Sequence, residues 1–449
     1  MPNENSYEVA LQKSNAIREG LAKTPEKFTM LTGDRPTGRL HLGHYFGTLK
    51  GRVELQNMGA KTNVLIADYQ VITDRDTTEH IQDNVYNMVM DYLACGIDPD
   101  KTMIYAHSAV PAANQLMLPF LSLVSEAELA RNPTVKAEME ASGHELTGLL
   151  LTYPVHQACD ILFCKGNVVP VGRDQLPHIE LTRTIARRFN NRYGKVFPEV
   201  DALLSETPLL PGLDGRKMSK SYDNTIALFG PREQLKKQIM SIVTDSRAPG
   251  EPKSTDGSAL YQIYRAFADD AEAAAFAQAF ADGIAWGDAK QRLFERIDAE
   301  IGPMRERYQH LIAHPEEVEQ LLLRGAEKAR AIATPFMREL RHAVGLRPLQ
   351  AAAQAGQAPA AIKTEVRASF KQYREQDGRF YFKLVDATGQ VLLQSRGFDS
   401  PREAGQAVKR LQTDGTAALD ALGAQLDLPG GASPALRDAL QMLQTAQQT

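Results

Sequence analysis

A glycine-rich stretch near the N-terminus carries two histidines at a spacing that suits phosphate chemistry. Residues 33–49 read Gly-Asp-Arg-Pro-Thr-Gly-Arg-Leu-His-Leu-Gly-His-Tyr-Phe-Gly-Thr-Leu, which places His41 and His44 three residues apart. Glycines let a backbone come close to a ligand, and a helix N-terminus offers unpaired N–H groups at the positive end of its dipole. Residues three apart share a helix face, so both imidazoles could donate hydrogen bonds to one phosphate chain. The stretch indicates a phosphate site, although a glycine-rich turn alone is about as often only a packing turn.

A second stretch, with two lysines, suits the same chemistry. Lys217 and Lys220 stand in Lys-Met-Ser-Lys-Ser, which follows Leu-Asp-Gly-Arg. Two lysines on a glycine-flanked loop can close over a triphosphate and neutralise the charge that builds on a departing pyrophosphate, which stabilises mainly the transition state. A lysine pair alone is more often a solvated basic loop, and the spacing by itself leaves both interpretations open.

An apolar helix between these stretches carries three polar residues on one face. Tyr153, Gln157 and Asp160 stand at positions i, i+4 and i+7 of the predicted helix 150–163. An aspartate on an apolar helix is costly to bury unless a ligand or a neighbour satisfies it. The face therefore predicts a binding pocket, with a purely structural Asp160 as the alternative.

Alternating strands and helices must position these residues. Short apolar runs predict strands at 28–32, 62–67, 102–106 and 168–172. Apolar spacing predicts helices at 42–58, 77–95, 113–124, 150–163 and 177–190. The charged segment 125–149 is either a mobile insertion or a solvated helical hairpin. Strands that alternate with helices predict an α/β fold with a doubly wound parallel sheet, in which ligands lie at the carboxyl ends of the strands.

The sequence predicts five parts. They are an N-terminal extension at 1–27 with a helix at 14–22, a Rossmann-type domain at 28–230, a helical domain at 231–347, a linker at 348–362, and a small α+β domain with a tail at 363–449. In the last part, strands are predicted at 379–385 and 391–393, followed by a helix at 401–411 and a low-complexity tail.

Composition and charge exclude several classes of protein. The 449 residues are 43% hydrophobic and 24% charged, as in ordinary globular proteins. The formal net charge of −4 does not by itself indicate a protein that binds nucleic acid. The three cysteines are too few for a disulfide framework or a four-cysteine zinc site. The N-terminus lacks an apolar signal core, and the longest apolar runs are too short for a membrane span. We expect a cytoplasmic protein without a membrane partner and without a metal site built from protein ligands.

Two of these stretches resemble the signatures of a known family. His41-Leu42-Gly43-His44 resembles the His-Ile-Gly-His signature of class I aminoacyl-tRNA synthetases and related nucleotidyltransferases, and residues 217–221 match the second synthetase signature. Two independent signatures in the expected order are unlikely to coincide by chance. The smaller nucleotidyltransferases generally have one catalytic domain and need no long helical domain, which makes them the alternative class.

The segments 151–162 and 169–180 resemble those of tryptophanyl-tRNA synthetases. The resemblance implies that Asp160 accepts the indole N–H, and that Tyr153, Val171 and Gln175 line the pocket and hold the amino group. One residue departs from the usual pattern, because Gln157 replaces a methionine and Tyr-x-x-x-Gln-x-x-Asp is the pattern of tyrosyl enzymes. This face alone therefore leaves tryptophan and tyrosine open. The flanking segments 31–38, 132–136 and 210–215 resemble a divergent bacterial branch of tryptophanyl enzymes that also carries glutamine here.

The same resemblance implies an ATP site and four catalytic residues, His41, His44, Lys217 and Lys220. The implied ATP contacts are Arg35, Pro36, Thr37, Gly43, His44, Gly172, Arg173, Asp174, Leu209, Lys217, Met218, Ser219, Lys220 and Ser221. Within this set, Gly172 and Asp174 would meet the ribose. Arg35 stands where the commoner form has glutamine, and an arginine there could pair with phosphate directly.

The activity implied is that of an ATP-dependent ligase. L-tryptophan would be activated with ATP and Mg²⁺ to tryptophanyl-adenylate and transferred to the 3′ end of tRNA(Trp), in a homodimer whose two subunits the tRNA spans. The helical domain would bind the anticodon stem through basic residues, each of which alone is more often a solvated helix charge. These are Arg324, Lys328, Arg330, Arg338 and Arg341.

Residues 367–413 resemble a small bacterial domain of unestablished function. This module could add RNA contacts through Lys371, Arg374, Arg379 and Lys383, or it could serve packing or other interactions. The sequence does not favour either role.

Overall fold

The computed structural model describes residues 4–73, 79–142, 146–204, 210–346, 368–386, 389–428 and 431–447. The chain divides into two compact units, Met1–Pro348 and Leu349–Thr449. The predicted linker and Leu209 lie outside the described residues. Among the described helices, none is both long and apolar enough to cross a membrane.

A five-stranded parallel sheet forms the centre of the first unit. Its order is β3-β2-β1-β4-β5. The strands are β1 (Thr29–Asp34), β2 (Lys61–Ile66), β3 (Thr102–Ala106), β4 (Val168–Val171) and β5 (Asp201–Leu204). Residues 62–66 of β2 are all buried, as expected for a strand covered on both faces. The parallel α/β fold is confirmed. The short strand β5 was not predicted.

The strand order reverses between β1 and β4. From β1 the chain builds outward through β2 to β3, and it then returns to place β4 and β5 on the other side. Both neighbours of β1 run parallel to it, with Thr29 paired to Lys61 on one side and Met30 to Val168 on the other. Open α/β sheets bind ligands at such a reversal, beyond the carboxyl ends of the strands.

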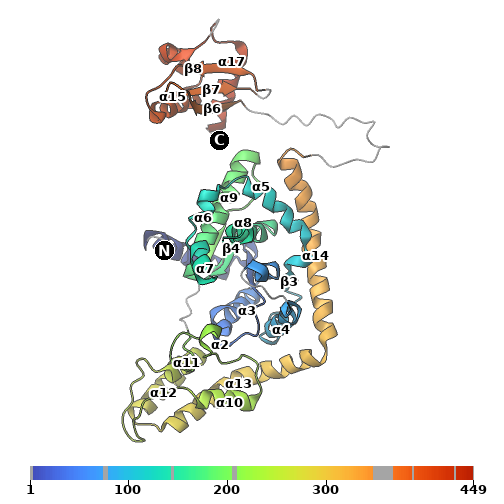
Figure 1. The fold of residues 1–449 in the computed structure, drawn as a ribbon, viewed down its shortest axis with the longest axis vertical. Helices are drawn as coiled ribbons and strands as arrows, with labels where there is room; N and C mark the ends of the chain where they lie inside the picture. Colours follow the sequence, from blue (N-terminus) through green and yellow to red (C-terminus); the bar gives the residue numbers. More distant parts are fainter. Residues whose placement is uncertain are drawn as a thin grey trace, which may run out of the picture. The chain divides into compact units, whose positions relative to one another are not determined.

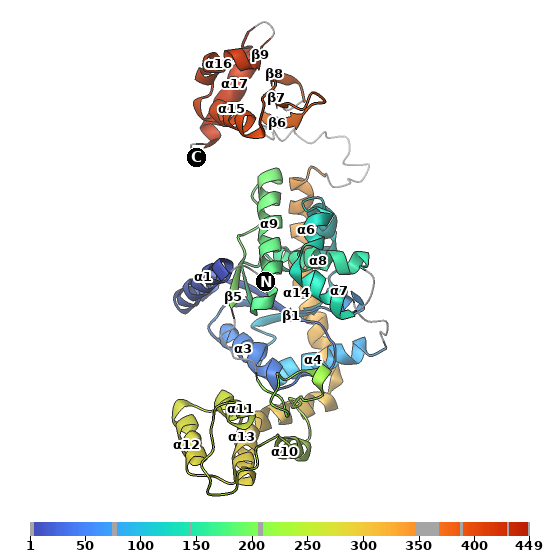
Figure 2. The ribbon, with the colours of Figure 1, turned by 60° about the vertical axis from the view of Figure 1, so that its left-hand side comes forward.

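Helices surround the sheet, and α1 packs against β5 (Figure 2). The helices before β5 are α1 (Glu4–Lys23), α2 (Leu42–His44), the π-helical turn η2 (Tyr45–Leu49), α3 (Lys50–Asn57), α4 (Ile81–Ala94), α5 (Met117–Leu121), α6 (Glu126–Ala130), α7 (Pro133–Ser142), α8 (Gly148–Phe163) and α9 (Leu176–Tyr193). Short 3₁₀ turns lie at Pro25–Lys27, Tyr69–Thr73, His107–Ala109, Pro111–Leu116, Arg173–Gln175 and Lys220–Tyr222. Within segment 125–149, α6 and α7 agree with the helical alternative.

A run of helices follows the sheet and shares its hydrophobic core. These are α10 (Arg232–Met240), α11 (Ala259–Phe267), α12 (Asp270–Ala281), α13 (Trp286–Ala313) and α14 (Pro315–Ala343). Phe267 of α11 meets Phe46 edge to face, with ring centroids 4.6 Å apart. One cluster of buried side chains joins residues from β2, α4, α11 and α13. The domain boundary predicted at residue 230 stays a prediction.

Helix α14 covers the outer edge of the sheet. It packs along β3, the edge strand (Figure 1). The approach is so close that a Cβ on Gly325 would lie 1.7 Å from the Ile104 carbonyl oxygen. Ala326, Ala329 and Ala333 are buried on the same helix. Small residues therefore let α14 protect an edge that would otherwise be open to pairing with another chain.

The second unit is a four-stranded antiparallel sheet of order β6-β7-β8-β9, with helices on one side (Figure 2). Its elements are β6 (Ser369–Arg374), β7 (Phe380–Val385), β8 (Val391–Ser395), β9 (Leu426–Asp427), α15 (Pro401–Asp414), α16 (Ala417–Ala421) and α17 (Pro434–Gln447). The predicted low-complexity tail contains α17. Leu436 and Leu440, one turn apart, are completely buried, so a four-residue apolar spacing within an Ala- and Gln-rich segment was sufficient for packing.

We expect Gly325→Ala to lower the free energy of unfolding by about 1–3 kcal/mol, because a methyl group placed against a backbone carbonyl forces α14 away from β3. Urea denaturation measures the change. Gly302→Ala in α13 is the matched control, since its Cβ would meet nothing within 4 Å. That change should stabilise the protein by about 0.5–1 kcal/mol. Equal effects of the two substitutions would contradict the close approach.

Candidate active site

The two signature histidines cap the first turn of α2. His41 is the residue before the helix, and its Nδ1 accepts a hydrogen bond from the Gly43 N–H at 3.1 Å. The Nδ1 of His44 accepts in turn from the His41 N–H at 3.2 Å. This reciprocal pair satisfies two of the N–H groups that a helix start leaves unpaired. A Cβ on Gly43 would lie 2.9 Å from the His41 ring, so glycine is needed for the ring to lie there.

Burial sets the charge of both imidazoles, and these hydrogen bonds set their tautomer. Burial, with the nearby charges of His44 and Lys220, lowers the pKa of His41 to about 3. Burial, together with Lys220 and Arg52, lowers the pKa of His44 to about 4 although the Asp34 charge opposes it. Both rings are therefore neutral at pH 7. Because each Nδ1 accepts a backbone hydrogen bond, the proton resides on Nε2, and each ring offers an N–H donor.

The lysine loop is held by Asn224, a buried residue that the sequence did not single out. Its Oδ1 accepts from the Ser219 N–H at 2.8 Å, and its Nδ2 donates to Asp214 Oδ1 at 2.7 Å and to the Lys217 carbonyl at 3.1 Å. The Met218 N–H donates to the Leu210 carbonyl, and the Met218 side chain is buried. Lys217 and Lys220 are exposed on the same loop.

The structure joins the histidine segment, through backbone hydrogen bonds, to the residues that follow the lysine loop. The Leu42 N–H donates to the Ile226 carbonyl at 3.0 Å, and the Leu228 N–H donates to the Leu40 carbonyl at 3.1 Å. Lys220 Nζ lies 3.5 Å from the Thr37 carbonyl oxygen in the glycine turn. The lysine loop therefore reaches the turn that precedes the histidines, as a shared phosphate site requires.

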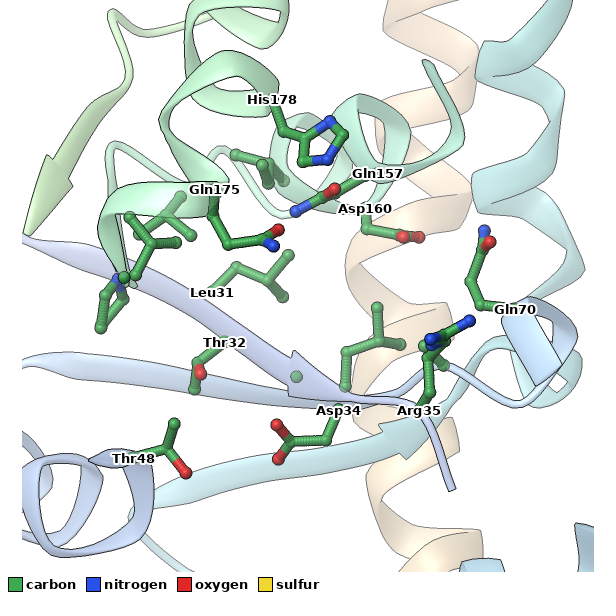
Figure 3. A pocket seen from close by; sticks show the side chains of 18 of the residues that line it. Leu31, Thr32, Asp34, Arg35, Thr48, Gln70, Gln157, Asp160, Gln175 and His178 are labelled. Carbon is green, nitrogen blue, oxygen red and sulfur yellow. The ribbon is translucent and has the colours of Figure 1, made fainter. Parts of the chain in front are cut away.

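A cavity of about 390 Å³ opens at the reversal of the strand order. All five predicted amino-acid-binding residues line it, namely Tyr153, Gln157, Asp160, Val171 and Gln175. Figure 3 shows the side chains of Gln157, Gln175 and Asp160 facing a common space. Arg35 and Gly172, predicted to contact ATP, also line this cavity.

Asp160 at the inner end of the cavity is paired with a histidine. His107 Nε2 lies 2.8 Å from Asp160 Oδ2, and both residues are buried. Burial lowers the pKa of His107, but the Asp160 carboxylate, helped by Asp68, outweighs it and raises this pKa above the ordinary value. This pair could not be predicted from the sequence, because residues 107 and 160 belong to different elements.

A second histidine, His156, lies beside this pair, and burial lowers its pKa. His156 Nδ1 lies 2.7 Å from Gln70 Nε2, and its Nε2 lies 2.7 Å from Asn114 Oδ1. His107, His156 and Asp160 are close enough to hold a metal ion. Both His156 nitrogens are engaged with amides, however, so the group is arranged as a hydrogen-bonded network.

Tyr153 has two polar neighbours that the sequence analysis also missed. Its hydroxyl lies 3.3 Å from His178 Nε2. Burial and a hydrogen bond to Glu138 raise the pKa of Tyr153, so the phenol stays protonated. Glu138 and His178 both line the cavity.

Asp34 at the end of β1 is bound by a buried arginine. Arg52 donates to both Asp34 oxygens, at 2.6 and 3.1 Å, and the Tyr92 hydroxyl donates to Oδ2 at 2.6 Å. Burial raises the pKa of Asp34, but the Arg52 charge and these hydrogen bonds bring it below its usual value. The ionised carboxylate and Arg52 both line the cavity, where Asp34 is already satisfied by protein donors.

A second cavity of about 430 Å³ shares one wall with the first. Gly172 lines both cavities, and Arg18 of α1 lines the second. A Cβ on Gly172 would lie 2.7 Å from Asp174 Oδ1. The Arg173 guanidinium packs 4.3 Å from the ring centroid of Tyr7, so α1 contacts a predicted ATP residue.

Not every predicted ATP contact lies in these cavities. Thr37 lies beside Lys220, while Pro36 and the lysine loop line neither cavity. His41 and His44 line neither cavity as well, although His44 is close enough to Asp34 and Arg52 to feel their charges.

We expect the His107–Asp160 pair to make stability depend on pH above neutrality. The pKa of His107 is higher in the folded protein than in the unfolded chain, where it is about 6.5. The pair therefore contributes its full share to the free energy of unfolding below that unfolded pKa, and this share is lost as pH rises through the folded pKa. The difference in unfolding free energy between the unsubstituted protein and His107→Gln should thus be larger at pH 6 than at pH 9. Urea titrations at the two pH values measure it. A difference that does not change with pH would contradict the charged pair.

Comparison with known proteins agrees with this geometry. Residues 23–301 match the family model "tRNA synthetases class I (W and Y)". The chain is 49% identical to a tryptophan--tRNA ligase of Xanthomonas campestris pv. campestris, over 84% of this chain and 90% of the relative. It is 43% identical to a tryptophan--tRNA ligase of Pseudomonas aeruginosa, over 91% and 95% of the two chains.

A solved structure and a second family model complete the comparison. The tryptophanyl-tRNA synthetase of Campylobacter jejuni, complexed with ADP and tryptophan, matches 71% of this chain and 100% of its own, with a TM-score of 0.66 and 35% identity. Residues 375–420 match a domain of unknown function (DUF1508). With the two signature segments joined beside a cavity at the strand reversal, the chain belongs to the class I aminoacyl-tRNA synthetase family, in its tryptophan--tRNA ligase branch.

Proposed function

We propose that this chain activates L-tryptophan with ATP and transfers the tryptophanyl group to the 3′ end of tRNA(Trp), with the residues assigned as follows. The observation that carries the proposal is the placement of Tyr153, Gln157 and Asp160 on one face of α8, lining a cavity beside the joined signature segments. The relatives named tryptophan--tRNA ligase support tryptophan as the amino acid.

Asp160 recognises the indole ring. The indole N–H can donate a hydrogen bond but cannot accept one, so the pocket must supply an acceptor for it. His107 donates to Oδ2, which leaves Oδ1 to accept the indole N–H. Burial opposes a raised pKa of His107, but the Asp160 carboxylate outweighs it, which favours an imidazole that donates to this carboxylate. Val171 lies along the ring. Tyr153, Gln157 and Gln175 bind the amino group and form the rim of the pocket.

ATP binds beside this pocket. The Nε2–H groups of His41 and His44 donate to the phosphates, Gly172 and Asp174 meet the ribose, and Arg35 pairs with phosphate near the tryptophan carboxylate. The remaining contacts come from the turn, from the loop and from the residues that flank the ribose. They are Pro36, Thr37, Gly43, Arg173, Leu209, Met218, Ser219 and Ser221.

Activation needs no covalent enzyme intermediate. A carboxylate oxygen of tryptophan attacks the α-phosphorus in line, the bond to the bridging oxygen breaks, and pyrophosphate leaves with the bonding electrons. Lys217 and Lys220 neutralise the charge that develops on pyrophosphate, and neutral histidines donate without repelling the lysines. The terminal ribose hydroxyl of the tRNA then attacks the adenylate carbonyl, loses its proton and expels AMP.

Mg²⁺ enters as part of the substrate MgATP. Protein sites for Mg²⁺ usually supply one or two carboxylates beside the phosphates. Asp34, whose charge acts on His44, is bound by Arg52 and Tyr92 and is poorly suited to a metal. Mg²⁺ would therefore be held by ATP and not by these protein carboxylates, and it would supply positive charge that stabilises the phosphates.

The tRNA contacts predicted on α14 divide into two groups. Lys328 donates to the Pro99 carbonyl, Arg330 donates to the Ala109 carbonyl, and Arg341 donates to the Gln115 side chain. These three hold α14 against the sheet. Arg324 and Arg338 are exposed and stay candidates for tRNA binding, with the anticodon stem placed on the helical segment.

We place the enzyme in the cytoplasm as a homodimer. Membership of the class I aminoacyl-tRNA synthetase family supports both assignments.

Asp160→Asn should raise KM for tryptophan by about 10- to 100-fold and leave KM for ATP unchanged, because a hydrogen bond to a charged acceptor contributes about 1.5–3 kcal/mol. ATP–pyrophosphate exchange measures both constants. Assays with all twenty amino acids decide the specificity. Exchange that depends on tyrosine would overturn the tryptophan assignment, and an unchanged KM would overturn the role of Asp160.

Lys220→Ala should lower kcat of exchange by about 10²–10³-fold with a small change in KM for ATP, since its charge acts mainly in the transition state. Lys237→Ala is the matched control, an exposed lysine on α10. If both variants lost the same activity, Lys220 would have no specific role.

A further inference from the structure

The appended sheet carries helices on one face and leaves the other face open (Figure 2). Phe382, Leu384 and Leu393 point to the helices and are buried. Because side chains alternate along a strand, Lys383 and its neighbours at odd positions of β7 lie on the opposite face. The register places Lys371 opposite Lys383 and Tyr373 opposite Tyr381.

Two lysines face each other directly across β6 and β7. Lys371 and Lys383 are a cross-strand pair, and like charges in this position destabilise a sheet. Neither lysine forms an ion pair within the part of the chain that the structure describes. An anion bound between the two lysines would remove the repulsion.

Two tyrosines continue this pair along the strands. The ring centroids of Tyr373 and Tyr381 are 5.7 Å apart, with planes inclined by 19°. The Tyr381 hydroxyl donates to Asp377 Oδ2 at 2.6 Å, and Lys383 Nζ lies 5.4 Å from the Tyr373 ring centroid. Gly397 is the neighbour of Tyr381, and a Cβ there would lie 2.8 Å from the hydroxyl oxygen. The tyrosines thus form a fixed aromatic surface beside two cations.

The other basic residues predicted for this module are engaged elsewhere. Arg374 donates to the Gly378 carbonyl and packs over Phe380. Arg379 lies 3.3 Å from Asp399. A carboxylate, Asp427, lies on the open face two strands away from Lys383, opposite Gln394. Two carboxylates lie nearer, in the turn between β6 and β7: Asp377 accepts from the Tyr381 hydroxyl, and Glu375 is close enough to both tyrosines for its charge to act on them. The lysine pair therefore forms the cationic end of this face, and the turn forms its acidic end.

We propose that the open face of β6 and β7 binds RNA, with Lys371 and Lys383 on backbone phosphates and an unpaired base stacked on the tyrosine surface. Lysines and aromatic rings on a flat sheet are the combination that proteins use for unpaired RNA. The RNA is the tRNA that the synthetase unit charges, which rests on the function proposed above. One chain carries both units, so the second contact benefits from a high effective concentration.

The full-length chain tests this proposal with fluorescently labelled tRNA(Trp) transcript, by anisotropy at several salt concentrations. Lys371→Glu/Lys383→Glu should weaken binding by about tenfold and lower the slope of log K against log salt by about two, one for each phosphate contact. Tyr373→Leu/Tyr381→Leu should weaken binding about fivefold or more, while Tyr373→Phe/Tyr381→Phe keeps the rings and should retain affinity. Circular dichroism verifies folding of each variant.

Arg402→Glu/Lys409→Glu on α15 is the matched control, with the same change of charge at two exposed positions on the helix-covered side. It should leave tRNA affinity unchanged. The proposal would be overturned if the control weakened binding equally, or if the Lys371/Lys383 variant kept its affinity. In the second case, the face would bind a protein instead of RNA. Tryptophan-dependent pyrophosphate exchange should be normal in every variant. Loss of that exchange in the unsubstituted chain would refute the proposed function instead of the RNA face.

Discussion

Two backbone hydrogen bonds between Leu40–Leu42 and Ile226–Leu228 are the interaction on which the catalytic geometry depends. They join the start of α2 to the segment that follows the lysine loop. Asn224 holds the lysine loop by accepting a hydrogen bond from the Ser219 N–H, and Lys220 reaches the Thr37 carbonyl. Because the positive charge of Lys220 lies this close, it helps burial to keep His41 and His44 neutral. The proposed phosphate site and the neutral histidines thus depend on the same set of contacts.

The pocket proposed for the amino acid is separate from the site proposed for the phosphates. The strand reversal between β1 and β4 opens the cavity, and α8 supplies one face of polar side chains to it. His107, which belongs to the turn after β3, lies 2.8 Å from one Asp160 oxygen. In the proposed pocket, the second Asp160 oxygen favours a ligand group that can only donate, as the indole N–H does. Gln157 shares this face with Asp160, so its departure from the usual methionine changes the wall of the pocket and leaves the acceptor in place.

The basic residues of this chain serve three different purposes. On α14, three of them bind carbonyl and amide oxygens of the sheet unit and hold the helix where Gly325 permits close contact. In the active site, Arg52 neutralises Asp34 within a buried cluster. On the appended sheet, Lys371 and Lys383 face each other without a carboxylate between them. The formal net charge of the chain is close to zero, but the lysine pair of the appended sheet still forms a local surface that favours anions.

The sequence by itself determined the chemistry-bearing segments and the fold class. His41, His44, Lys217 and Lys220 stand in short motifs, and apolar runs of fixed period define strands and helices, because both signals are local along the chain. The tertiary structure decided which distant residues meet. The His107–Asp160 pair, the Asp34–Arg52–Tyr92 cluster, the support of the loop by Asn224 and the division of the basic residues all depend on strand register and helix packing. Spacing along the chain carries no record of those contacts, since each joins elements whose relative placement is set only when the core is packed.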